Sequence, residues 1–244
     1  MSNSMSVRTR RIRAVFRKEL REYRRSGNIV FAMAVIPFIF LIQPLIQVFA
    51  IPSSASAALR HEDSLLYLLA IPAIVPALVA AYGVVGERQQ GTLEPVLTTP
   101  VRRDEFVMGK ALASLLPSAA VAYAVYAVFL ACVRLFASPP VASALLRWPE
   151  ILAQVLFTPM IAAWSIWIGL AISARSTDIR VAQQLGMLAS LPTVAVTSLV
   201  AFNVIRPTLA LALGAAALLL VLNAAGWRLV SALFNRERLI ASAR

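Results

Sequence analysis

The sequence contains very little histidine or cysteine. One histidine, His61, and one cysteine, Cys132, occur among its 244 residues. A single cysteine excludes a disulfide within the chain and a cysteine-rich metal centre. His61 lies beside Glu62 and Asp63, but without a second histidine or a cysteine ligand this trio fits a solvated loop far better than a metal site. We therefore expect no metal site.

Charged residues are also scarce. They make up 14% of the chain against 60% hydrophobic residues, and the mean hydropathy is +0.78. Soluble domains carry about 25% charged residues, so this balance is wrong for a soluble core. Several runs of about 20 residues hold no charge at all, which is typical of membrane-spanning helices. Because irregular backbone cannot face lipid, we predict an all-α integral membrane protein with six transmembrane helices.

The middle of every predicted span lacks Asp, Glu, Lys, Arg and His. Proton-coupled carriers keep such groups in the membrane despite their cost, so their absence argues against a proton-driven carrier. An intramembrane aspartyl or zinc protease lacks its ligands here, and a Ser-His pair lacks a histidine within a span. We therefore do not expect the chain to be an enzyme.

The net charge is +12, but its distribution argues against nucleic acid as a partner. Nineteen of the 23 Lys and Arg residues fall on one side of the predicted membrane and four on the other. Basic residues concentrate on the cytoplasmic side, where anionic lipids attract them. We predict a multi-pass protein of the cell (plasma) membrane, in contact with the lipid bilayer, with both termini in the cytoplasm.

The chain divides into three parts. Residues 1–28 form a cytoplasmic amphipathic elbow helix, because Ile12, Val15, Phe16, Leu20 and Tyr23 follow helical spacing on one face between basic residues. This helix is suited to the membrane interface, and Gly27-Asn28 is expected to end it. A transmembrane domain covers 29–227, and a polar tail covers 228–244. The predicted spans are 29–51, 65–85, 111–136, 151–173, 181–205 and 208–227.

A charged loop at 86–110 separates the second and third spans. Gly86 and Gly91 have the spacing of a phosphate-binding loop, but Thr92 stands where the lysine is needed and a span precedes the motif, so it does not bind ATP. Thr92 is suited to cap a short helix and Pro100 to end it. Asp104 is then expected to cap the third span's helix.

This loop resembles the cytoplasmic segment of ABC transporter permeases of the type-2 exporter class, which handle drugs, lipids and polysaccharides. Val96 and Gln89 depart from the family's usual residues. The matching positions are Glu87, Arg88, Gly91, Thr92, Leu93, Glu94, Leu97, Thr99, Pro100, Val101, Glu105, Gly109 and Lys110.

The resemblance implies the transmembrane permease subunit of an exporter driven by a separate ABC ATPase subunit, which binds the ATP. The permease would need no cofactor and would pair as a homodimer or with a second permease. The alternative is a membrane scaffold or sensor that binds an ATPase without transporting. The residues expected to couple the loop to the ATPase are Glu87, Arg88, Gly91, Thr92, Leu93, Glu94, Leu97, Pro100 and Glu105.

Uncharged polar residues within the spans have two interpretations. Most such residues join helices through hydrogen bonds, but several together can line a substrate path. The lack of charge in the middle of the spans favours an amphipathic or apolar substrate. The candidates for the path are Gln43, Gln47, Gln154, Asn203 and Asn223.

Overall fold

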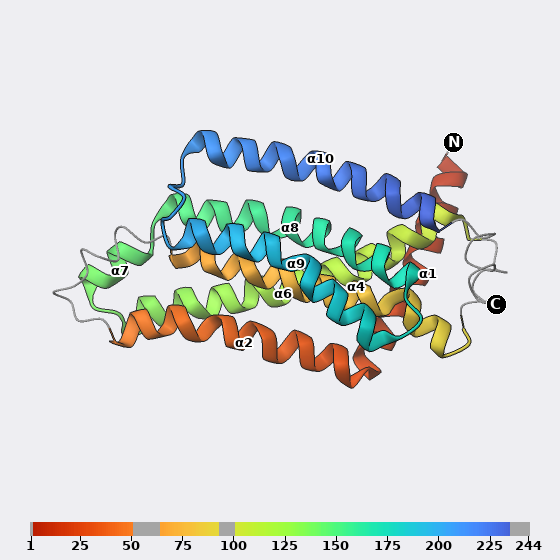
Figure 1. The fold of residues 1–244 in the computed structure, drawn as a ribbon, viewed down its shortest axis with the longest axis horizontal. Coiled ribbons are helices and arrows are strands. Elements are labelled where there is room, and N and C mark those ends of the chain that lie inside the picture. The colour runs from red at the N-terminus through yellow and green to blue at the C-terminus, as the bar shows by residue number, and fades with distance from the viewer. Residues whose placement is uncertain (1, 51–63, 93–100, 235–244) are drawn as a thin grey trace.

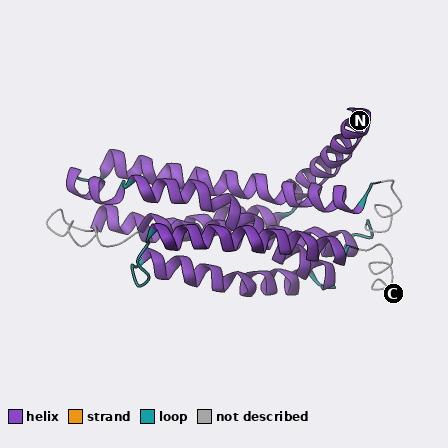
Figure 2. Cartoon of the chain, turned by 90° about the horizontal axis from the view of Figure 1, so that it is seen from above, coloured by secondary structure: helices purple, strands orange, loops and turns teal. Residues whose placement is uncertain are grey.

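The structure is a computed structural model of the chain and describes residues 2–50, 64–92 and 101–234. The described residues form helices joined by short turns and contain no strand (Figure 2). The prediction of an all-α fold is confirmed.

Six helical segments are long and apolar enough to cross a membrane. They lie side by side as an elongated bundle (Figure 1). This confirms the prediction of six spans in a multi-pass membrane protein. The segments are α2 (Gly27–Ala50), the 3-10 helix η2 (Ser64–Leu69) continued by α4 (Ala70–Gln89), α6 (Arg103–Phe136), α8 (Trp148–Arg175), α9 (Ile179–Ala201) and α10 (Leu209–Leu233).

Several helices extend beyond the apolar runs that predict them. α4 continues to Gln89 and α6 begins at Arg103, so the loop predicted over 86–110 is non-helical at most between Gln90 and Arg102. Glu, Arg, Gln and Lys are good helix formers, and backbone hydrogen bonding therefore continues where the apolar run stops. A short helix, α7 (Pro139–Leu145), lies between the predicted spans 111–136 and 151–173.

α4 is the central helix of the bundle. Every residue in its membrane-length window is buried, because its neighbours α2, α6, α8 and α9 surround it (Figure 1). The sequence of α4 is apolar on all sides and rich in alanine and valine, as expected of a helix enclosed by others. The charged loop therefore leaves the bundle directly from its core.

α1 (Ser2–Arg25) lies at one end of the bundle and at an angle to the spans (Figures 1 and 2). Only Ser26 separates it from α2, so Gly27-Asn28 begins the next helix instead of ending this one. The apolar face predicted to lie in the membrane interface packs on the protein itself: Val15 and Tyr23 are buried, and α6 is the main neighbour.

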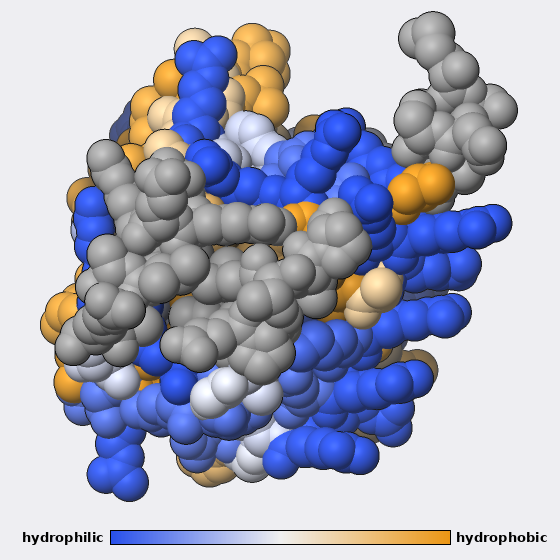
Figure 3. Space-filling model, turned by 90° about the vertical axis from the view of Figure 1, so that its right-hand side faces the viewer, coloured by the Kyte–Doolittle hydropathy of each residue, from blue (hydrophilic) through white to orange (hydrophobic). Residues whose placement is uncertain are grey.

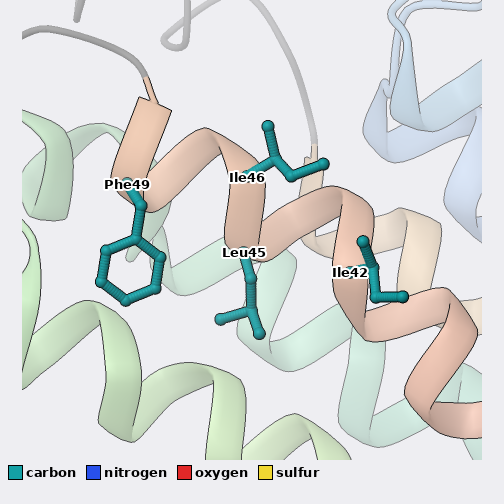
Figure 4. A pocket seen from close by; sticks show the side chains of 4 residues that line it. All are labelled: Ile42, Leu45, Ile46 and Phe49. Atoms are coloured by element: carbon teal, nitrogen blue, oxygen red, sulfur yellow. The ribbon is translucent and has the colours of Figure 1, made fainter.

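Apolar side chains cover the outer faces of α2, α9 and α10. The outer surface of α2 carries a hollow lined by residues of this one helix, Ile42, Leu45, Ile46 and Phe49 (Figure 4). Exposed apolar surface of this extent is normal for a protein whose outside faces lipid.

Candidate functional site

The first half of the predicted coupling segment closes the end of α4. Gly91 has a φ of +67°, the left-handed conformation that favours glycine. The amide of Gly91 donates to the carbonyl oxygen of Arg88 at 3.2 Å, and that of Thr92 to the carbonyl oxygen of Glu87 at 2.9 Å. These two bonds form a Schellman motif. Gly91 therefore makes the sharp turn that ends α4, and Thr92 completes this turn.

Arg88 connects the end of α4 to the end of α8. Its guanidinium donates to the carbonyl oxygens of Ser176 at 2.5 Å and Ala174 at 3.2 Å. Carbonyl groups at a helix C-terminus lack partners within the helix, and a cation there is favourable. Arg88 therefore fixes the α4 foot of the loop to the neighbouring span.

The other foot of the loop is the start of α6. Arg102 is the N-cap residue, and its backbone amide donates to Glu105 Oε2 at 2.9 Å. Asp104, predicted as the cap, lies inside the first turn and pairs with Arg8 of α1 at 3.0 Å. The N-cap position of α6 is Arg102, two residues before the predicted cap Asp104. Glu105 itself is buried, and its Oε2 lies 3.5 Å from Arg11 Nη1.

Leu93, Glu94, Leu97 and Pro100 lie outside the described residues. The short amphipathic helix expected there, and its contact with an ATPase, stay predictions.

A buried group of charges joins α1, α4 and α6 beside the loop. We call Lys18, Glu19, Glu22, Glu87 and Lys110 the lysine cluster. Lys110 is fully buried, and its Nζ lies 2.7 Å from Glu19 Oε1 and 3.2 Å from Glu87 Oε2. It also donates to the carbonyl oxygen of Gly83 at 2.8 Å.

The second lysine of the cluster lies nearer the surface. Lys18 Nζ contacts Glu87 Oε1 and lies 3.2 Å from Glu22 Oε1. Each carboxylate of the buried pair, Glu19 and Glu87, therefore has a lysine within ion-pair distance, as buried charges require. The carboxylate of Glu87 is engaged within the chain, so any part it plays in coupling passes through this cluster.

Burial acts in opposite directions on the pKa values of Glu19 and Lys18, two neighbouring residues of α1. Burial raises the pKa of Glu19 to about 7, although Lys110 acts to lower it. Burial would lower the pKa of Lys18, but the carboxylates of Glu87, Glu19 and Glu22 raise it above its ordinary value. Burial disfavours the charged form of each side chain, and nearby charges of opposite sign favour it. The pKa of Glu19 is set mainly by burial, whereas that of Lys18 is set by its three carboxylate neighbours.

Carboxylate oxygens of Glu19, Glu22 and Glu87 lie within 4.8 Å of one another, a spacing at which three acids can hold a metal ion. The ammonium groups of Lys18 and Lys110 stand among them and supply the positive charge. The arrangement is that of an internal ion-pair network.

The sequence predicts that the charged residues of α1 lie on the polar face of an interfacial helix, and Lys18, Glu19 and Glu22 were therefore missed. The signal was present. Glu19 stands four residues after Val15 and four before Tyr23, both on the predicted apolar face. An acid in the centre of an apolar face indicates a buried partner of opposite charge.

The candidate path residues do not act alike. The Asn223 amide group donates to the carbonyl oxygen of Met160 at 3.0 Å, and its Oδ1 accepts from Trp167 Nε1 at 3.0 Å. Asn223 thus joins α10 to α8. Asn203 has a φ of 58° and lies in the turn after α9.

The glutamines differ from Asn223. Gln154 is buried on α8 and donates to Thr158 Oγ1 at 3.5 Å, while its Oε1 has no hydrogen-bond partner among the described residues. Gln43 Oε1 is likewise without a partner in the described part of the chain. The side chain of Gln47 lies outside the described residues. A path along these groups stays a prediction.

A comparison with curated protein sequences gives no match. The family model described as ABC-2 family transporter protein matches residues 13–232. The match begins within α1, includes all six spans, and contains both feet of the loop and the whole lysine cluster. It covers far more than half of the sequence. The chain therefore belongs to the ABC-2 transporter family.

Proposed function

We propose that the chain is the permease subunit of an ABC exporter, driven by a separate ATPase subunit that docks on the 86–110 loop. Membership of the family supports a transport role with an ATPase partner. The observation that carries the docking role is the origin of the loop, which leaves from the fully buried central helix α4. A force applied to the loop therefore acts on the core of the bundle.

The substrate we propose is amphipathic or apolar and moves out of the cytoplasm. The middle of each span carries no charged residue. The buried charges near the span ends are already paired: Lys110 with Glu19, and Glu150 with Arg147. A strongly charged substrate would lack a counter-charge midway across the membrane, where an unpaired ion is costly.

We propose that the working unit contains two permease chains, either identical or of two kinds. The outer faces of α2, α9 and α10 offer extended apolar surface for a second permease as well as for lipid. The distribution of Lys and Arg supports placement in the plasma membrane with both termini in the cytoplasm.

Affinity purification from mild-detergent membranes tests the proposal. We expect a tagged chain to bring down a soluble subunit with a P-loop and an ABC signature sequence. The mass of the intact complex then distinguishes a homodimer from a heterodimer of permeases. Recovery of this chain alone from a complex shown to be intact would overturn the docking role.

The alternative is a membrane scaffold or sensor that binds the ATPase without transport. ATP hydrolysis by the reconstituted complex separates the two functions. An exporter responds to added apolar compounds with a changed rate of hydrolysis, whereas a scaffold does not.

A further inference from the structure

Contacts between α1 and α6 follow the same order along both helices. Two ion pairs lie nearest the N-termini of the two helices. An apolar contact follows, and a buried ion pair and a buried hydrogen bond come last. The contacts are Arg8 with Asp104 at 3.0 Å, Arg11 with Glu105 at 3.5 Å, Val15 against Gly109, Glu19 with Lys110 at 2.7 Å, and Tyr23 with Ser114 at 3.1 Å.

Lys110 is the one residue of this row that also contacts α4 through ionic and hydrogen bonds. Its ammonium group reaches Glu87 Oε2 and the carbonyl oxygen of Gly83 on that helix. Its Nζ lies 4.9 Å from the centre of the Phe106 ring, so apolar surface closes the remaining side. All three of its polar partners are therefore fixed by two other helices.

The cost of leaving this arrangement is high. Lys110 is fully buried and Glu19 is 1% exposed, so water does not replace a lost partner. Removing one partner of a buried ion pair is strongly destabilising, because the other charge stays buried and unpaired. Separation of α1 from α6, or of α6 from α4, would leave such a charge.

The positions of Glu87, Lys110 and Glu19 in the sequence show which helices the lysine cluster connects. Glu87 lies in the last turn of α4 and Lys110 about two turns into α6, so their ion pair joins the two helices from which the loop leaves the bundle. Glu19 of α1 forms an ion pair with the same ammonium group of Lys110. We propose that Lys110 is a positioning residue that joins α1 to both feet of the loop, so that a displacement of the loop moves α1, α4 and α6 together. This inference rests on the proposed function, in which an ATPase displaces the loop.

The first test needs only the full chain in detergent and measures amide hydrogen exchange in α1. In Lys110→Met, Glu19 loses its closest cation, and we expect exchange in α1 to rise by at least about tenfold. Arg8→Met is the matched control. It removes an ion pair of the same interface that is 55% and 42% exposed, and exposed pairs contribute little, so exchange in α1 stays at the wild-type rate.

The second test separates positioning from simple stability. Glu19→Gln/Lys110→Met removes both charges of the closest pair, while Lys18 still pairs with Glu87. Since Val15 and Tyr23 keep their contacts with α6, we expect α1 to remain docked with exchange near the wild-type rate. The complex with the co-purified ATPase is then measured with and without a non-hydrolysable ATP analogue.

In the wild-type complex we expect the analogue to change exchange at both feet of the loop and in α1. In the double variant we expect the response at the feet to remain and the response in α1 to be lost. An equal response in α1 of both proteins would overturn the positioning role, as would unchanged exchange in Lys110→Met. If no ATPase co-purifies, the proposed function fails, and exchange of the chain alone still decides whether Lys110 holds α1.

Discussion

Two lysines and three glutamates meet in the lysine cluster, so the cluster is neutral only when one carboxyl group holds a proton. Burial raises the pKa of Glu19 to about 7, so Glu19 is the carboxyl group that takes up this proton as the pH falls below about 7. Two charged groups of other helices face Glu19: Lys110 of α6 and Glu87 of α4. Lys18, Glu22 and Tyr23 lie near Glu19 on α1 itself. The docking of α1 is therefore linked to proton uptake.

The sign of this linkage follows from the pKa. The ordinary pKa of a glutamate is 4.5, so between roughly pH 4.5 and 7 Glu19 holds a proton in the folded protein that it has lost in the unfolded chain. The contribution of Glu19 to the free energy of unfolding is thus greatest below pH 4.5, falls between pH 4.5 and 7, and is constant above pH 7. We expect the melting temperature to fall between pH 5 and 8 by about 2–4 °C for each kcal/mol lost.

Thermal unfolding in detergent across this pH range is the measurement, and Glu19→Gln is the comparison. The variant cannot take up this proton, so its melting temperature changes less with pH than that of the wild type. Parallel curves for the two proteins would show that the proton is bound elsewhere.

Residues of the site differ in how far the sequence predicts them. Gly91 was predictable because a left-handed turn after a helix has a local cause. The burial of Glu87 and Lys110 was not, because both stand in a charged segment that is indistinguishable from a solvated loop. Their environment is set by α1, whose Glu19 is more than sixty residues away in the sequence.

The approach of helix α1 to α6 depends on Gly109. A Cβ atom at this position would lie 2.6 Å from Val15 Cγ1 and 2.7 Å from Val15 Cβ, which is closer than carbon atoms pack. We expect Gly109→Ala to destabilise the protein by about 1–3 kcal/mol through this overpacking and to loosen α1.

Gly214→Ala is the control for the same substitution in another helix. Apart from the backbone of α10 itself, no atom of the described residues lies within 4 Å of the added methyl group, and alanine favours a helix by up to about 1 kcal/mol over glycine. Melting temperature and amide exchange in α1 measure both variants. Equal melting temperatures for the two would contradict the close packing of α1 on α6.

The predicted docking of the loop on the ATPase depends on the apolar face of its short helix. Leu93→Asp/Leu97→Asp places charges on its predicted apolar face, where each leucine is worth about 1.5–3 kcal/mol when buried in a partner. We expect normal membrane insertion but loss of coupling between ATP hydrolysis and export of a fluorescent lipophilic dye in vesicles. Thr98→Asp, on the same loop, is the control for added charge. Unchanged export by the double variant would refute docking through this face.

The apolar runs of the sequence predict how many helices cross the membrane, but they do not predict where each helix begins and ends. The six spans follow from run length, because about 20 apolar residues cross a bilayer. The runs do not encode the helical ends, and α6 therefore starts eight residues before the predicted span, at Arg103. The same helical extension brings Lys110 and Glu87 into register with α1.

At the scale of the whole molecule, the two ends of the bundle differ in charge. α1, both feet of the loop and the end of α10 lie at one end (Figure 1). Hydrophilic residues cover most of the described surface there (Figure 3). Nineteen of the 23 Lys and Arg residues belong to the segments assigned to this end. The charge difference therefore predicts that this end of the bundle faces the cytoplasm.

Single cysteines test this orientation because the natural chain has one cysteine, Cys132. In a Cys132→Ser background, Thr177→Cys lies in the turn between α8 and α9 and Val204→Cys in the turn between α9 and α10. Both positions are exposed, and α9 separates them across the membrane. We expect a membrane-impermeant maleimide to label Val204→Cys in intact cells and Thr177→Cys only after permeabilisation. The reverse pattern would place the charged loop outside the cell, away from ATP, and would exclude an ATP-driven role for it.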